Sequence, residues 1–118
     1  MRYLCLLTGE PDLPGPVPGS AEFAQMLEDY QSATAAMAAA GVLIDSCALQ
    51  PPSAATTLRV RGGKPFTTDG PYAETKEQIG GYYVLDCATL DEALRWAAMI
   101  PAARYGAVEL HPVLEMHT

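Results

Sequence analysis

The chain has 118 residues, of which 49% are hydrophobic and 18% are charged, and its 14 acidic and 7 basic side chains give a formal net charge of −7. This length fits one hydrophobic core, and the composition is that of a globular chain rather than a disordered one. The negative charge would repel phosphate backbones and anionic lipid surfaces. We therefore expect one domain over residues 1–118, with no nucleic-acid partner and no membrane partner.

Six β-like runs and two helical segments follow one another along the chain. Strands are predicted at residues 2–8, 42–49, 56–61, 64–67, 81–87 and 107–116. Ser20 can cap a helix whose apolar positions recur at helical spacing up to Gly41. The sequence TLDE at residues 89–92 is a capping box, and it predicts a second helix that ends before Pro101. The residues expected on the buried stripe of this helix are Leu90, Ala93, Leu94, Ala97 and Ile100.

This order predicts an α+β fold, a ferredoxin-like βαββαβ arrangement with an inserted β-hairpin. Gly62 and Gly63 suit the tight turn of that hairpin. The helices would lie on one face of a largely antiparallel sheet and leave the other face bare. Because a bare face with tyrosine and aliphatic side chains needs a cover, we expect a homodimer in which two sheets form an α/β barrel.

The cysteines and the N-terminus indicate the compartment. The apolar run in MRYLCLLTGEPD is too short for a secretory signal or a membrane span, which predicts a cytoplasmic protein. Cys5, Cys47 and Cys87 are odd in number, widely spaced and embedded in apolar strand-like segments. This pattern indicates buried, reduced thiols rather than a disulfide framework or a metal site.

Three stretches of the sequence resemble a known family. Residues 50–86, QPPSAATTLRVRGGKPFTTDGPYAETKEQIGGYYVLD, are followed by DEALRWAAMIPAA at 91–103 and VELHPV at 108–113. Together they resemble the bacterial YCII-related proteins, in particular the branch with an Asp-Gly-Pro-Phe (DGPF) signature. The resemblance implies a dimeric α/β barrel of ferredoxin-like protomers, often encoded beside extracytoplasmic-function sigma factors. Fold relatives include isomerases, dehalogenating lyases and cofactor-free monooxygenases, and the fold does not choose among them.

The resemblance also implies candidate catalytic positions. In the better-known branch of the family, a histidine on the first helix and an aspartate form a proposed acid/base pair. Tyr30 holds the place of that histidine here, and a tyrosine can transfer a proton if its pKa is lowered. Asp69 begins the signature, and Tyr72 replaces its usual phenylalanine and adds a hydroxyl near Asp69.

Each candidate also has a structural interpretation. Asp69, Gly70 and Pro71 form a turn, and as a base Asp69 would need partial burial to raise its pKa. Tyr30 lies on the apolar stripe of the first helix, where a core tyrosine is the default. Gln78, which precedes two glycines, either lines a pocket or ties its loop to the sheet.

The remaining candidates are charged or titratable. Arg59 shares a strand face with Arg61, and the two either hold an anionic group or serve solubility. Glu109 and His111 share a face of the last strand, where they can transfer protons, bind a metal or form a dimer-interface hydrogen bond. Arg104 either reaches an anionic ligand or caps the preceding helix.

Two functional hypotheses follow. The first is a small cofactor-independent enzyme doing acid/base chemistry, of isomerase or lyase type, on a small organic molecule in a barrel cleft. Asp69 would be its base or orienter, and the other residues assigned to the site are Tyr30, His111, Tyr72, Gln78, Arg59, Arg104 and Glu109. No cofactor and no metal are expected, because the sequence lacks a phosphate-cradling glycine loop, a redox CxxC and a firm set of metal ligands.

The second hypothesis is a non-catalytic dimeric module that binds a ligand or regulates a partner, linked to sigma-factor signalling. A cavity in which two titratable side chains converge would support the enzyme. A filled barrel with Asp69 bonded only to its own loop would support the module.

Overall fold

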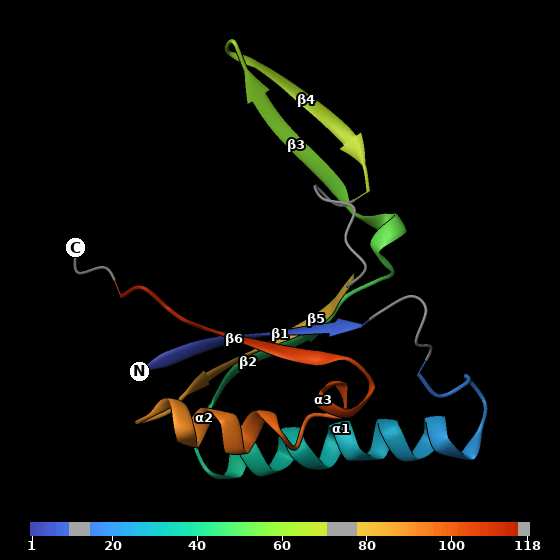
Figure 1. The fold of residues 1–118 in the computed structure, drawn as a ribbon, viewed down its shortest axis with the longest axis vertical. Coiled ribbons are helices and arrows are strands. Elements are labelled where there is room, and N and C mark those ends of the chain that lie inside the picture. The colour runs from blue at the N-terminus through green and yellow to red at the C-terminus, as the bar shows by residue number, and fades with distance from the viewer. Residues whose placement is uncertain (10–14, 71–77, 116–118) are drawn as a thin grey trace.

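The computed structural model describes residues 1–9, 15–70 and 78–115 (Figure 1). Its elements are β1 (Arg2–Gly9), α1 (Ala21–Ala39), β2 (Leu43–Ala48), the 3-10 turn η1 (Pro52–Ala54), β3 (Thr56–Arg61), β4 (Lys64–Asp69), β5 (Gln78–Asp86), α2 (Leu90–Ala97), α3 (Ala102–Tyr105) and β6 (Ala107–Pro112). The predicted strands and the two longer helices are present. The short helix α3 was not predicted, because four residues are too few to show a helical period.

The main sheet has four strands in the order β2-β5-β1-β6, and its neighbouring strands are antiparallel. The helices lie on one face of this sheet (Figure 1). β3 and β4 form a separate two-stranded sheet, whose turn places Gly62 and Gly63 at φ 58° and 76°. Both positive φ values fit a type I′ hairpin turn. The prediction of an α+β fold with an inserted hairpin is therefore confirmed.

The N-termini of α1 and α2 are capped by the side chains that the sequence indicates. The Ser20 hydroxyl accepts a hydrogen bond of 3.1 Å from the Phe23 N–H at the start of α1. The Thr89 hydroxyl accepts a hydrogen bond of 3.2 Å from the Glu92 N–H at the start of α2, and the Glu92 carboxylate accepts one of 3.0 Å from the Ala88 N–H. These bonds satisfy N–H groups that a helix leaves without an internal partner.

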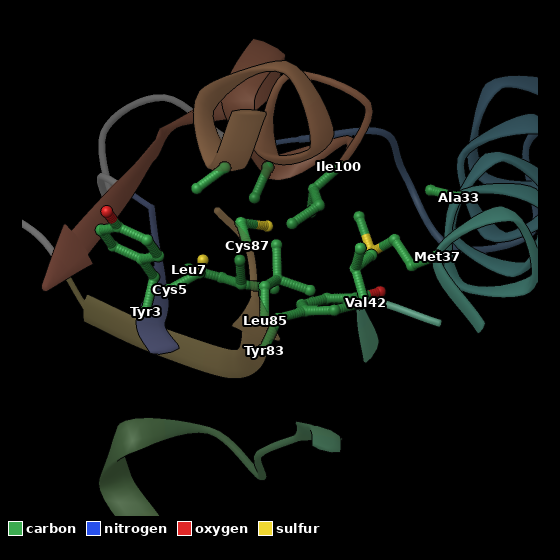
Figure 2. Packing of buried hydrophobic residues seen from close by; sticks show 12 residues of the cluster. Tyr3, Cys5, Leu7, Ala33, Met37, Val42, Tyr83, Leu85, Cys87 and Ile100 are labelled. Atoms are coloured by element: carbon green, nitrogen blue, oxygen red, sulfur yellow. The ribbon is translucent and has the colours of Figure 1, made fainter. Parts of the chain in front are cut away.

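The core lies between the helices and one face of the main sheet (Figure 2). Alternate residues of β1 and β5 face it, and the buried residues that these strands and the helices contribute include Tyr3, Cys5, Leu7, Tyr83, Leu85, Ala33, Met37 and Ala93. The predicted stripe of α2 is only partly correct. Ala93 and Ala97 are buried, whereas Leu90 and Leu94 are exposed. Ala93 and Ala97 form the buried face of this short helix and Trp96 packs against the core beside them, whereas Leu90 and Leu94 lie outside that contact.

The cysteines are free, but they are not all buried. Cys5 and Cys87 belong to the core, as predicted, whereas Cys47 is exposed and the prediction was wrong for it. Cys47 pairs with Tyr82 across β2 and β5, on the face of the sheet that has no helices. A position on the edge strand β2 and on the helix-free face leaves its thiol exposed in a single chain.

We predict that Cys47 reacts first with a disulfide reagent in the folded protein. Burial raises the pKa of Cys5 to about 11 and also raises that of Cys87, so both remain unreactive thiols at pH 8. The absorbance of the thiolate released from the reagent should show one fast-reacting cysteine in buffer. In denaturant it should show three. The Cys47→Ser variant should lose the fast phase, and three equally fast thiols in the native protein would contradict the burial pattern.

Within the described ranges, no helix is long and apolar enough to cross a membrane.

Candidate functional site

A pocket of about 380 Å³ lies at one end of the main sheet. The end of β1, the start of β5, one side of α1 and the segment from α3 to β6 form its walls. Apolar contacts come from Leu7, Met26 and Ile79, and the polar side chains are Thr8, Tyr30, Gln78 and Tyr105. No charged side chain belongs to the part of the lining that the structure describes. The described part of the lining is therefore uncharged and largely apolar.

The close approach of two backbone segments forms one wall. A Cβ atom at Gly106 would overlap the carbonyl oxygen of Thr8, so only glycine lets the α3–β6 connection lie against the end of β1. The Thr8 hydroxyl donates a hydrogen bond of 3.3 Å to the carbonyl oxygen of Ala107 at the same place. The pocket wall is thus built from main chain as much as from side chains.

An irregularity in the sheet shapes the part of the wall that β5 forms. β1 pairs Leu7 with Gly81 but Thr8 with Ile79, so Gly80 is an extra residue of β5 at this point. The Gly80 carbonyl oxygen accepts a hydrogen bond of 2.9 Å from the Leu49 N–H, on the β2 side of β5. Such a bulge bends a strand and redirects the side chains beyond it. As a result, Ile79 and Gln78 contribute to the pocket.

Tyr30 is the titratable group that links the pocket to the core. Its side chain is half-buried and packs against the core cluster. Burial raises the pKa of the Tyr30 phenol above its ordinary value of 10.0, and the neighbouring phenol of Tyr83 raises it further. A backbone hydrogen bond from Ala102 and the charge of Arg104 act in the opposite direction without reversing the shift of this pKa. The hydroxyl is therefore a protonated hydrogen-bond donor at neutral pH.

Arg104 links the short helix α3 to α1 beside the pocket. Its guanidinium donates a hydrogen bond of 3.0 Å to the Asp29 carboxylate on α1, and its Cζ atom lies 5.7 Å from the centre of the Tyr105 ring. The pair with Asp29 is half-exposed, so its contribution to stability is small. Arg104 thus contacts the helix that carries Tyr30 and a neighbouring aromatic ring that lines the pocket.

Comparison with known proteins identifies the family. The YCII-related domain matches residues 1–117. The chain belongs to the YCII-related family. A similar protein is the uncharacterized protein R00369 of Rhizobium meliloti (strain 1021), which is 40% identical over 91 residues, covering 75% of this chain and 73% of that protein.

In this YCII-related chain, Asp69 lies at the base of the β3–β4 hairpin and does not line the pocket. It is exposed and pairs with Thr56 across the hairpin. The adjacent Gly70 has φ 96°, its N–H donates a hydrogen bond of 2.6 Å to the Ala55 carbonyl oxygen, and its own carbonyl oxygen accepts one of 2.8 Å from the Thr57 hydroxyl. This geometry agrees with the interpretation of the signature as a turn.

The structure separates the other predicted residues. Arg59 is exposed on β3 of the hairpin, and Tyr72 lies outside the described residues. His111 and Glu109 share the helix-free face of β6, where His111 Nε2 lies 3.1 Å from a carboxylate oxygen of Glu109. Of the eight candidates, Tyr30 and Gln78 therefore belong to the pocket, and Arg104 lies beside it.

Among the residues with described positions, no three histidine, cysteine or acidic side chains gather in a way that could hold a metal ion.

Several pocket residues were not identified as candidates from the sequence. Met26 lies at an apolar position of the first predicted helix and Leu7 in the first predicted strand, and nothing in their spacing separates a pocket wall from a core. Tyr105 and Gly106 stand together between a helix and a strand, where an aromatic residue beside a glycine is a usable signal of close backbone approach.

Proposed function

We propose that this YCII-related protein binds a small, uncharged organic molecule in the pocket at the end of the main sheet. The observation that carries the proposal is a lining whose described side chains are uncharged and include Tyr30, and the raised pKa of its phenol supports a neutral donor there. A ketone, ester or lactone would place its oxygen at this donor and its apolar body against Met26 and Ile79. Gln78 can add a second hydrogen bond.

Ligand binding without catalysis is the form of this function that the geometry supports best. The titratable side chains that the structure places in the pocket wall are the phenols of Tyr30 and Tyr105. A tyrosine transfers a proton as a base when its pKa is lowered, but the pKa of Tyr30 is raised, so it is a poor base. Asp69 and His111, the other proposed catalytic groups, lie on the hairpin and on the helix-free sheet face.

A cofactor-independent isomerase or lyase is the second candidate. It is favoured by the same phenol, because a Tyr30 that stays protonated can serve as a general acid toward a bound carbonyl oxygen. Asp69 would then have to act as base from the hairpin of the same chain or of a second copy.

The proposal includes a homodimer of two ferredoxin-like protomers. The central strands of the helix-free face carry Leu4, Leu6, Tyr82 and Val84, which are only partly buried in one chain. Covering these side chains with the same face of a second copy would remove apolar surface from water and close a barrel between the two sheets.

Changing Tyr30 to phenylalanine should weaken ligand binding without unfolding the protein. A panel of small ketones, esters and lactones is screened by thermal shift and protein NMR. For a ligand that binds, loss of one neutral hydrogen bond is expected to raise the dissociation constant about 3- to 10-fold. Because the raised pKa keeps the phenol neutral, wild-type affinity should stay constant from pH 6 to 9 and fall only as the phenolate forms at higher pH.

The matched control is Tyr82→Phe, which removes a hydroxyl outside the pocket that donates to the Asp45 carboxylate. It should leave affinity unchanged.

Native mass spectrometry of protein from unpurified extract adds a search for a retained metabolite. Conversion of a bound compound in the NMR tube, lost in Tyr30→Phe, would favour the enzyme over the binding module. Equal affinities of the Tyr30→Phe variant and the wild type would contradict the proposed donor.

A further inference from the structure

The β3–β4 hairpin stands away from the rest of the fold, on the side of the main sheet opposite the helices (Figure 1). The radius of gyration is 16.2 Å. A compact domain of this length would have a radius of about 13 Å. The strands of the hairpin pair with each other and form no part of the main sheet. Because an isolated two-stranded hairpin is only marginally stable in water, this one needs a surface to lie on.

Both faces of the hairpin carry large apolar side chains in solvent. Leu58 and Val60 lie on one face with 62% and 56% of their surface exposed, and Phe66 lies on the other with 55% exposed. In a monomeric soluble protein such residues are usually scattered singly. Three of them within one short hairpin indicate that a partner covers it.

Charge distinguishes the hairpin from the remaining chain. Residues 56–69 contain three basic side chains, Arg59, Arg61 and Lys64, and one acidic side chain, Asp69. Since the whole chain has 7 basic and 14 acidic side chains, the rest of it carries 4 basic and 13 acidic ones. The hairpin is thus a positive projection from a strongly negative body. A second copy of the same chain offers it a surface of opposite charge.

The helix-free sheet face fits the hairpin in both polarity and position. Its central strands carry partly buried apolar side chains, while Asp45 on β2 and Glu109 on β6 place carboxylates on the two outer strands. The hairpin rises on the same side of the sheet as this face (Figure 1). A second copy that covers the face would therefore lie beside the hairpin.

We propose that the β3–β4 hairpin is an intermolecular arm that lies against the acidic, helix-free side of a second copy of this chain. Two-fold symmetry makes the contact reciprocal, so each chain both gives an arm and receives one. The arms would bring positive charge to two bodies that otherwise repel each other. The inference rests on the proposed homodimer and adds the element that holds it together.

Paired variants with the same chemical change test the arm. Val60→Asp alters the hairpin, and its control Val17→Asp alters a side chain of the body that is 70% exposed. Lys64→Glu alters the charge of the hairpin, and its control Arg95→Glu makes the same change in net charge on α2. Sedimentation equilibrium gives the dimer dissociation constant of each protein, and circular dichroism checks its fold. Each hairpin variant should raise that constant about tenfold or more, and each control should leave it nearly unchanged.

The outcomes separate the arm from the dimer. A wild-type dimer that both hairpin variants leave intact would overturn the arm and leave the homodimer standing. A wild type that stays monomeric at millimolar concentration would overturn both. Hydrogen exchange of the wild type answers the question without a variant, because amides of residues 56–69 should exchange faster on dilution below the dissociation constant. Equal exchange at high and low concentration, in a protein that dissociates over that range, would also overturn the arm.

Discussion

Replacing Gly106 with alanine is expected to destabilise the protein by about 3 kcal/mol, because the new Cβ atom meets backbone rather than a flexible side chain. The overlap is with the carbonyl oxygen of Thr8, and the Cα of Gly9 is 3.0 Å from the same Cβ position. Relief of the overlap requires the α3–β6 connection to move away from β1. Urea unfolding followed by circular dichroism measures the loss of stability.

Gly80→Ala is the matched control for Gly106→Ala. Gly80 also lines the pocket, but no heavy atom lies within 4 Å of a Cβ built there, and its φ is not positive. Its replacement should change the free energy of unfolding by less than about 1 kcal/mol. Any ligand found for the pocket should also bind the Gly106 variant more weakly than the Gly80 variant. Equal stability losses in the two variants would contradict the close approach at Gly106.

Replacing Leu85 with alanine is expected to lower the free energy of unfolding by about 3 to 4 kcal/mol, through lost burial and the cavity left behind. Leu85 is fully buried on β5, the strand that pairs with both β1 and β2, and its side chain points toward the helices (Figure 2). Rigid strands on either side restrict collapse around the cavity. Thermal and urea unfolding measure the difference.

Leu94→Ala is the matched control for this core substitution. Leu94 lies on α2 with 46% of its surface exposed. Because it loses little burial and alanine favours a helix, the change should cost under about 1 kcal/mol. Similar losses of unfolding free energy in the Leu85→Ala and Leu94→Ala variants would contradict the assignment of Leu85 to the core and Leu94 to the surface.

Local patterns predicted the elements well. The alternation in β1, the helical spacing that follows Ser20 and the Gly62–Gly63 turn are each properties of a short stretch. Burial of individual side chains was predicted less well. Leu94 and Cys47 share the apolar character of buried neighbours, and only the position of the helix or strand within the fold exposes them.

The candidate site was predicted in part, because the pocket combines segments that are far apart in the sequence. Tyr30 and Gln78 line it, although α1 and β5 are separated by the hairpin along the chain. Asp69 was selected because it begins a family signature. The sequence could not show that Asp69, at the base of the hairpin, stays outside the pocket lining, since the position of the hairpin depends on contacts outside the local pattern.

The extra residue at Gly80 has a consequence for how this pocket changes between relatives. Shortening β5 by that one position would restore regular pairing with β1 and turn the preceding side chains, Gln78 and Ile79, to the opposite side of the pleat. Leu85 and its neighbours further along the strand would keep their orientation. The lining of the pocket can therefore be altered by a single deletion, with the core composition left as it is.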